Sequence, residues 1–137
     1  MPAQQVNYRE IDKNNYIIFY DKAKSFYDAM QNEYEFENWP AVGLNAVHCV
    51  ISANDALLVK RKGIYCSAKE HLKTVDLLTQ NIIDKDLKQA SNHLRKVIAL
   101  KNTIEYEAKP FIKKMAETIN IHITKFFQWV SVLLKKD

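Results

Sequence analysis

Turn-forming residues are scarce in this 137-residue chain, which has only 2 glycines and 3 prolines. Sandwiches, barrels and doubly wound sheets contain many tight turns that these residues supply, so the composition argues against such folds. A bundle of long helices needs few turns, and a chain of this length can bury one core. The sequence therefore predicts one all-α domain over residues 1–137, with its core at about 8–135, built as an up-and-down bundle of about five helices.

The motifs of common enzymes and phosphate-binding loops are also missing. The chain contains no GxxxxGK[ST], GxGxxG, HExxH, paired CxxC or GxSxG sequence. Its histidines fall on four different predicted helices, so we expect each of them to be structural and expect neither a metal site nor a cofactor. These histidines are His48, His71, His93 and His122.

Cysteine is nearly absent as well. Cys49 and Cys66 are too few for a disulfide framework, and they indicate a reducing compartment. The first residues have no basic flank followed by an apolar run, and the most apolar later stretch is interrupted by His122, Lys125 and Gln128. We therefore expect a cytoplasmic protein that does not cross a membrane.

Charge is distributed unevenly along the chain. Residues 1–58 carry a net charge of −4, whereas residues 59–137 carry +8. A basic half can attract phosphate groups. It can also complement the acidic half within one molecule or a dimer, and lysine-rich solvated helix faces are the simpler explanation.

The spacing of apolar residues predicts five helices and most of their ends. The second helix is apolar around most of its circumference, so we expect it to be central and to end at Gly63 in a left-handed cap. A capping box at Ser67 to Glu70 is expected to start the third. The predicted ranges are about 8–34, 40–61, 67–82, 86–105 and 111–134.

Tyrosines form a stripe along the first predicted helix, at positions 16, 20, 27 and 34. Such a stripe can stack bases. Burial in the core or a partly wet dimer contact is the favoured interpretation, because each hydroxyl requires a hydrogen-bond partner.

A polar stripe on the second helix has the residue types of a nucleophilic triad: His48, Ser52 and Asp55. Successive helical turns place these side chains in a row rather than around one reacting atom. In addition, no glycine turn exposes the serine or supplies an oxyanion hole. We interpret the stripe as structural.

Lys101 is the clearest local inconsistency in the sequence, since it occupies a stripe position where the fourth helix should be apolar. Glu105 follows one turn later, and Tyr106 is next to it. The lysine can hold a phosphate while the carboxylate or phenol acts beside it, or the two charges can form a salt bridge. Asp55, on the buried helix, is a possible partner for Lys101 across the bundle, and Asn102 is a further candidate binding residue.

The order of these pieces resembles the HEPN superfamily of helical domains. The resemblance rests on Ala46–Leu58 (AVHCVISANDALL), then Gly63 and His71, and later on Lys101-x-x-x-Glu105-Tyr106 before a long final helix. It covers residues from about 16 to 134. It implies a helical bundle that usually forms a dimer. Many members of the superfamily are metal-independent ribonucleases, often toxins paired with a nucleotidyltransferase-type antitoxin, so the resemblance implies such an activity and partner as expectations.

The ribonucleases of this superfamily use an Arg-x(4–6)-His motif, in which arginine grips the scissile phosphate and histidine assists proton transfer. Here Lys101 stands at the arginine position, and an ammonium group lacks the planar bidentate contact of a guanidinium. Glu105 and Tyr106 stand where the histidine is needed. We therefore predict a non-catalytic HEPN-like homodimer that binds a protein partner or a nucleotide or RNA. The alternative is a toxin-type ribonuclease that uses Lys101, Glu105 and Tyr106.

Overall fold

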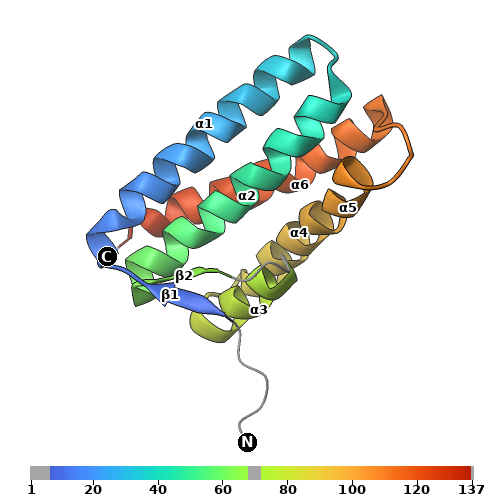
Figure 1. Ribbon diagram of the computed structural model, residues 1–137. Coiled ribbons are helices and arrows are strands. Elements are labelled where there is room, and N and C mark those ends of the chain that lie inside the picture. Colours follow the sequence, from blue (N-terminus) through green and yellow to red (C-terminus); the bar gives the residue numbers. More distant parts are fainter. Residues whose placement is uncertain (1–6, 68–71, 137) are drawn as a thin grey trace, which may run out of the picture.

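The computed structural model describes residues 7–67 and 72–136 and confirms the predicted all-α helical bundle (Figure 1). Long helices form its body, and a two-stranded sheet lies at one end. The helices are α1 (Tyr16–Glu35), α2 (Trp39–Lys62), α3 (Leu72–Asn81), α4 (Leu87–Ala99), α5 (Lys101–Glu105) and α6 (Lys113–Leu134).

The central element is α2, as its apolar circumference predicts. Helices α1, α4 and α6 all pack against it, and most of its residues between Val42 and Val59 are buried. Pro40 lies in its first turn, and Gly63 ends it with φ 66° in the left-handed region. Its length and composition would allow it to cross a membrane. However, 72% of its most apolar window is buried inside the protein, as in the core helix of a soluble protein.

The N-terminal segment differs from the predicted helix, which was expected to begin at about residue 8. Tyr8–Glu10 forms strand β1, which pairs antiparallel with β2 (Ile64–Cys66), and the 3-10 helix Lys13–Asn15 leads into α1. The backbone N–H of Ile11 donates to the carbonyl of Gly63 at 2.8 Å, so the turn after α2 holds this segment in place. A three-residue strand carries too little periodicity to be recognised from sequence.

The tyrosine stripe of α1 packs inward against α6. Tyr20 Oη lies 3.0 Å from Ser131 Oγ, and Tyr27 Oη lies 3.4 Å from Thr124 Oγ1. Both rings stack on Phe127, with centroids 5.8 and 4.9 Å from its ring. These contacts support the core interpretation of the stripe, because the two hydroxyls find their partners within the same chain.

The fourth predicted helix is interrupted at Leu100, which forms a turn between α4 and α5. Gly43 of α2 allows the second piece to approach closely. A Cβ atom at Gly43 would lie only 2.8 Å from Ile104 Cδ1. Lys101 therefore begins a separate short helix, which explains why it does not continue the apolar stripe of α4. The prediction of one continuous helix through Lys101 was wrong.

The basic end of α2 is partly used to stabilise the end of α6. The Lys60 Nζ donates to the carbonyl of Leu134, and Arg61 Nη2 donates to the carbonyl of Leu133 at 2.8 Å. The last carbonyls of a helix lack partners within the helix and carry partial negative charge. These two cations therefore have a structural role.

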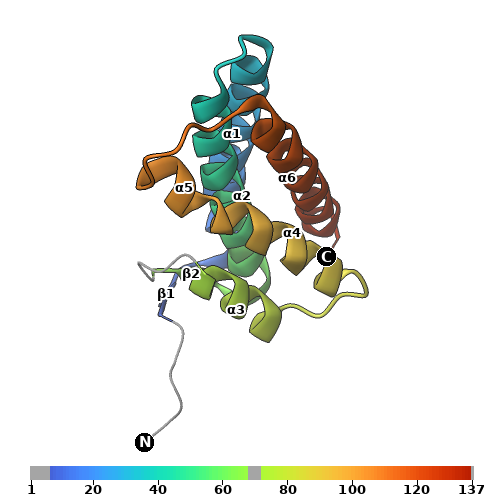
Figure 2. The same ribbon diagram turned by 90° about the vertical axis from the view of Figure 1, so that its right-hand side faces the viewer.

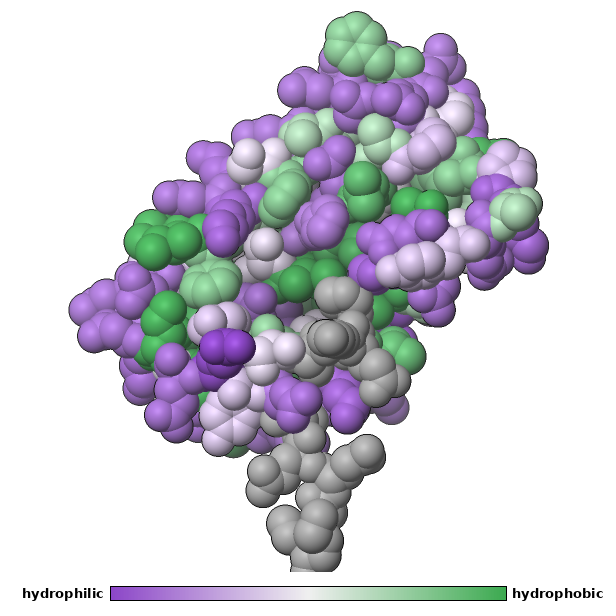
Figure 3. All heavy atoms as spheres, in the orientation of Figure 1, coloured by the Kyte–Doolittle hydropathy of each residue, from purple (hydrophilic) through white to green (hydrophobic). Residues whose placement is uncertain are grey.

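Exposed apolar side chains are dispersed rather than collected in one patch. The three most exposed are Phe36, Ile83 and Tyr106, which lie at three separate connections between helices. On the face drawn in Figure 3, hydrophilic residues are interspersed with apolar ones, which show in the middle of the face and also at its left-hand and upper edges. The predicted capping box ends in residues 68–70, which lie outside the described part of the chain.

Candidate functional site

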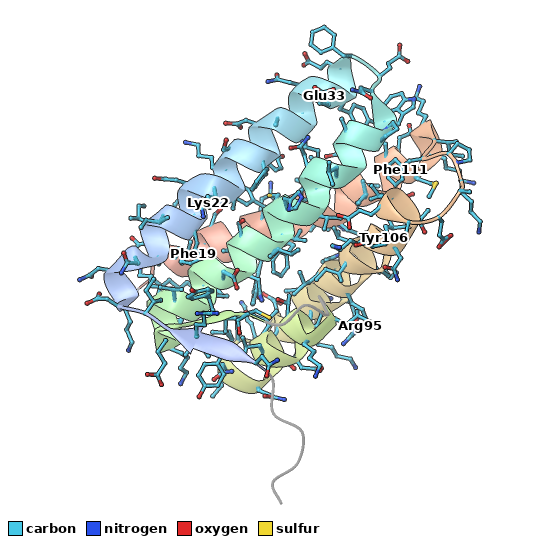
Figure 4. All side chains as sticks on the ribbon, in the orientation of Figure 1. Phe19, Lys22, Glu33, Arg95, Tyr106 and Phe111 are labelled. Carbon is cyan, nitrogen blue, oxygen red and sulfur yellow. The ribbon has the colours of Figure 1, made fainter. Side chains whose placement is uncertain are left out.

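The predicted site residues of α5 form a local cluster. Lys101 Nζ donates to Glu105 Oε2 at 2.6 Å, and the ammonium lies 5.4 Å from the centroid of the Tyr106 ring. Only 15% of the Lys101 side chain is exposed, so the cation is largely covered, as its position in the sequence suggested. Tyr106 stands at the outer edge of the α4–α5 arm (Figure 4) and is 74% exposed.

The positive charge of Lys101 is neutralised within the cluster by Glu105. The hydrogen bond from Lys101 lowers the pKa of Glu105 below its ordinary value, which keeps the carboxylate charged beside the ammonium. A phosphate approaching Lys101 would meet that carboxylate first, and like charges repel. Asn102 is exposed next to the pair, and its carbonyl accepts from the backbone N–H of Tyr106 at 2.9 Å. The cluster is therefore an ion pair at i,i+4 spacing with little positive charge to offer a ligand.

Asp55 lies elsewhere and has a different partner. Its Oδ1 accepts from the backbone N–H of Cys66 at 3.1 Å, which ties α2 to strand β2. The hypothesis of an ion pair between Asp55 and Lys101 was wrong, because each group already has another partner. Burial raises the pKa of Asp55 to about 7, although the hydrogen bond from Cys66 and the charge of Lys22 oppose the shift. Asp55 is thus a buried acid that titrates near neutrality.

Two histidines that sequence analysis treated separately meet between α4 and α6. His93 Nδ1 lies 2.9 Å from His122 Nδ1, and the ring centroids are 5.1 Å apart. Both rings are half-buried. Burial and the charges of Lys125 and Lys96 hold the pKa of His93 below the ordinary value of 6.5, and burial, His93 and the same two lysines lower the pKa of His122.

The histidine pair lines an open groove of about 740 Å³ between α4 and α6. The two helices adjoin on the side of the bundle that faces the viewer in Figure 2. We call this feature the basic groove and define it by His93 and Lys96 from α4 and by His122 and Lys125 from α6. Its walls also contain polar amide side chains that can contact a ligand: Gln89, Asn92 and Gln128.

The order of charges along the basic groove follows from helix direction. Trp129 Nε1, late in α6, donates to Asp84, just before α4, at 2.9 Å, whereas His122, earlier in α6, meets His93 within α4, so α4 and α6 run antiparallel. Each lysine follows its histidine by three residues, about 4.5 Å of helical rise. Lys96 and Lys125 therefore flank the histidine pair on opposite sides, and both side chains are exposed.

A sequence signal for this groove does exist. His93-x-x-Lys96 and His122-x-x-Lys125 are two copies of one pattern, with a histidine and a lysine one turn apart on the same helix face. The copies lie on helices that are not consecutive, so their meeting depends on the tertiary fold. Sequence periodicity alone cannot show that contact.

Other chemistry has less support within residues 7–67 and 72–136. No group of three or more histidine, cysteine or acidic side chains in these residues could hold a metal ion. The ring of His48 packs on Phe26 with centroids 5.2 Å apart, and Asp55 is occupied by Cys66. The stripe of His48, Ser52 and Asp55 is consistent with the structural interpretation made from the sequence.

Comparison of the chain with protein-family models, with curated proteins and with solved structures finds no match. Arguments about function therefore rest on the residues and their geometry.

Proposed function

We propose that this protein is a HEPN-like helical domain that binds the phosphate backbone of RNA in the basic groove, without catalysis by the Lys101 cluster. The observation that carries the proposal is the convergence of two lysines and two histidines in one open groove. Nucleic-acid backbones are bound by grooves in which cationic side chains follow the line of phosphates.

The arrangement suits an extended phosphate chain. Lys96, the histidine pair and Lys125 succeed one another along the groove, about one helical turn apart. Phosphate contacts supply affinity, whereas side-chain amides can contact base edges or sugar hydroxyls. Gln89 and Gln128 of the groove walls are candidates for this second role, as is the amide NH₂ of Asn92, whose oxygen accepts from Arg95 Nη1 at 3.0 Å.

The groove also accounts for part of the charge asymmetry. Both of its helices lie in the basic half of the chain, residues 59–137. Three other cations of that half are engaged within the fold: Lys60 and Arg61 at the end of α6, and Lys101 with Glu105. Lys96 and Lys125 instead project from a concave surface, where a bound anion meets several donors at once.

Fluorescence anisotropy with a labelled single-stranded RNA, measured over a range of salt concentrations, tests the proposal. The variant Lys96→Gln/Lys125→Gln should bind more weakly, and its plot of log K against log salt should be shallower by about 1.4, since each phosphate contact contributes about 0.7 for single strands. The matched control is Lys24→Gln/Lys114→Gln, which removes the same charge from exposed positions on α1 and the start of α6. It should retain the wild-type slope.

Two results would contradict the proposal. Equal effects of the groove and control variants would mean that net charge alone governs binding. Cleavage of the RNA that disappears in Lys101→Ala would favour the alternative, a toxin-type ribonuclease using Lys101, Glu105 and Tyr106.

The proposal extends to assembly and location. We propose a cytoplasmic homodimer, with a nucleotidyltransferase-type antitoxin as a possible protein partner, on the HEPN resemblance. Light scattering after size-exclusion chromatography measures the mass directly, and a mass of one 16.0 kDa chain would contradict the dimer.

A further inference from the structure

The hydrogen bond between the two imidazoles restricts where protons can lie. In the 2.9 Å contact one Nδ1 must donate and the other must accept, so the accepting ring is neutral. A neutral imidazole with a free lone pair on Nδ1 carries its proton on Nε2. The accepting ring therefore always has an Nε2–H donor.

The protonation state of the donating ring determines which hydrogen-bond donors and acceptors the pair offers to a ligand. When this ring is neutral, its Nε2 has a lone pair, and the pair offers one N–H donor and one acceptor. When this ring is protonated, its Nε2 is also a donor, and the pair offers two N–H groups and one positive charge. The oxygens of an RNA phosphodiester are acceptors only, so they bind the protonated pair more tightly than the neutral pair, which offers one N–H donor beside a repelling lone pair.

The surroundings favour the neutral pair while the groove is empty. Burial lowers the pKa of both rings, as do the facing cations Lys96 on α4 and Lys125 on α6, and His93 adds to the effect on His122. Asp86 also lines the groove, about two helical turns before His93, and Trp129 of the groove wall donates to Asp84. An anion between the two ammonium groups would cancel the field that opposes protonation.

Among the described residues, the charges that shift the pKa values of the pair are those of Lys96 and Lys125 and of the rings themselves. Helix α3, which packs on α4, carries Lys73 and Asp76, and neither contributes to these shifts. On α2, His48 packs against Phe26, and Asp55 is bonded to Cys66. Helix α1 reaches α6 through neutral groups, among them Tyr27 with Thr124 and Gln31 with Asn120. On α5, Lys101 is paired with Glu105.

We propose that the His93–His122 pair takes up one proton when a phosphate group binds between Lys96 and Lys125, so that phosphate affinity rises as pH falls. The inference rests on the proposed function for its natural ligand, because it assigns to the basic groove a proton-linked mode of binding. By linkage, a ligand that favours the protonated pair is itself bound more tightly when protons are abundant.

Anisotropy with labelled single-stranded RNA at fixed ionic strength, between about pH 8 and about pH 5.5, tests this directly. The association constant should rise by up to about tenfold for each unit fall in pH, as expected for uptake of one proton. The rise should level off once the free pair is itself protonated. RNA phosphodiesters do not titrate in this range, so the dependence reports on the protein.

Variants separate this proposal from a general effect of pH. The double variant His93→Gln/His122→Gln retains an amide in place of each ring and removes both groups that can carry the proton, so it should bind with a flat pH profile. His48→Gln is the matched control, and it should keep the wild-type dependence because His48 lies on α2 against Phe26. A pH-dependent profile that survives in the His93→Gln/His122→Gln variant would overturn the inference.

A second measurement keeps the test independent of RNA. NMR titration of the imidazole resonances, with and without inorganic phosphate, should show the pKa of the pair rising when phosphate is present. If wild-type RNA binding is salt-sensitive yet independent of pH, the inference fails and the proposed function stands. If RNA does not bind but inorganic phosphate raises the pKa of the pair, the phosphate site stands with a small ligand and the proposed function fails. If phosphate leaves the pKa unchanged, the inference fails.

Discussion

Replacement of Asp55 by asparagine tests the electrostatics of the core. The carboxyl is only 7% exposed, and its pKa is raised from 3.8 to about 7, chiefly by burial. Because the raised pKa belongs to the folded state, the protonated form is the one that folding favours. The stability that the protonated Asp55 carboxyl contributes to the fold is fully present below about pH 4 and is lost as the pH rises towards 7.

The magnitude follows from the pKa difference. One pKa unit corresponds to about 1.4 kcal/mol, so the ionised carboxylate costs the folded state at most about 4 kcal/mol at about pH 8. Asparagine has nearly the same shape, keeps an oxygen to accept from Cys66 and cannot ionise. Asp55→Asn should therefore be more stable than the wild type by about 2 to 4 kcal/mol at about pH 8, and by about 1 kcal/mol at about pH 4.5.

Urea denaturation of both proteins at the two pH values measures this difference. The two proteins must be compared at the same pH, because His93 and His122, with lowered pKa values, destabilise the fold as pH falls. In the wild type this trend opposes that of Asp55, and it cancels in the difference between the two proteins. Asp55→Ala is the control, since it loses the acceptor for Cys66 and should be destabilised by about 1 to 3 kcal/mol at about pH 4.5. Equal stability of Asp55→Asn and wild type at both pH values would refute the reasoning.

Two further predictions concern the α5 region. Gly43→Ala should lower the free energy of unfolding by about 1 to 3 kcal/mol, because the added Cβ would lie 2.8 Å from Ile104 Cδ1 and 2.9 Å from Phe111 Cζ. Thermal denaturation measures this effect, and an unchanged midpoint would contradict the close approach. Lys101→Ala should change stability by less than about 1 kcal/mol, because it removes one ion pair in the less favourable i,i+4 order. It should also leave RNA affinity within about twofold, and a loss of binding comparable to that of the groove variant would argue for the Lys101 cluster as the site.

Local sequence patterns predicted most of the helices. The apolar circumference of α2 and the left-handed cap at Gly63 are properties of short segments, and the structure confirms them. The contacts of Tyr20 and Tyr27 with α6 are consistent with the core interpretation of the α1 stripe. The two failures, strand β1 and the turn at Leu100, arise where a short segment is shaped by contacts with distant residues. Propensity is weak in such places, and tertiary packing decides.

The candidate site was harder to predict than the fold. Lys101 attracted attention because it breaks a pattern, and the structure places it in an ion pair with Glu105. The sequence analysis interpreted the histidines as structural, because they fall on different helices, and His93 and His122 are 29 positions apart. Their contact exists only after α4 and α6 have packed antiparallel, and no single-helix pattern encodes that arrangement.

The most direct test of the central claim is to map where RNA touches the protein. Amide chemical-shift changes on addition of a short single-stranded RNA should concentrate on the facing sides of α4 and α6, around Lys96 and Lys125, and should include the indole N–H of Trp129. Changes centred on Lys101 to Tyr106, with α4 and α6 unaffected, would contradict the account.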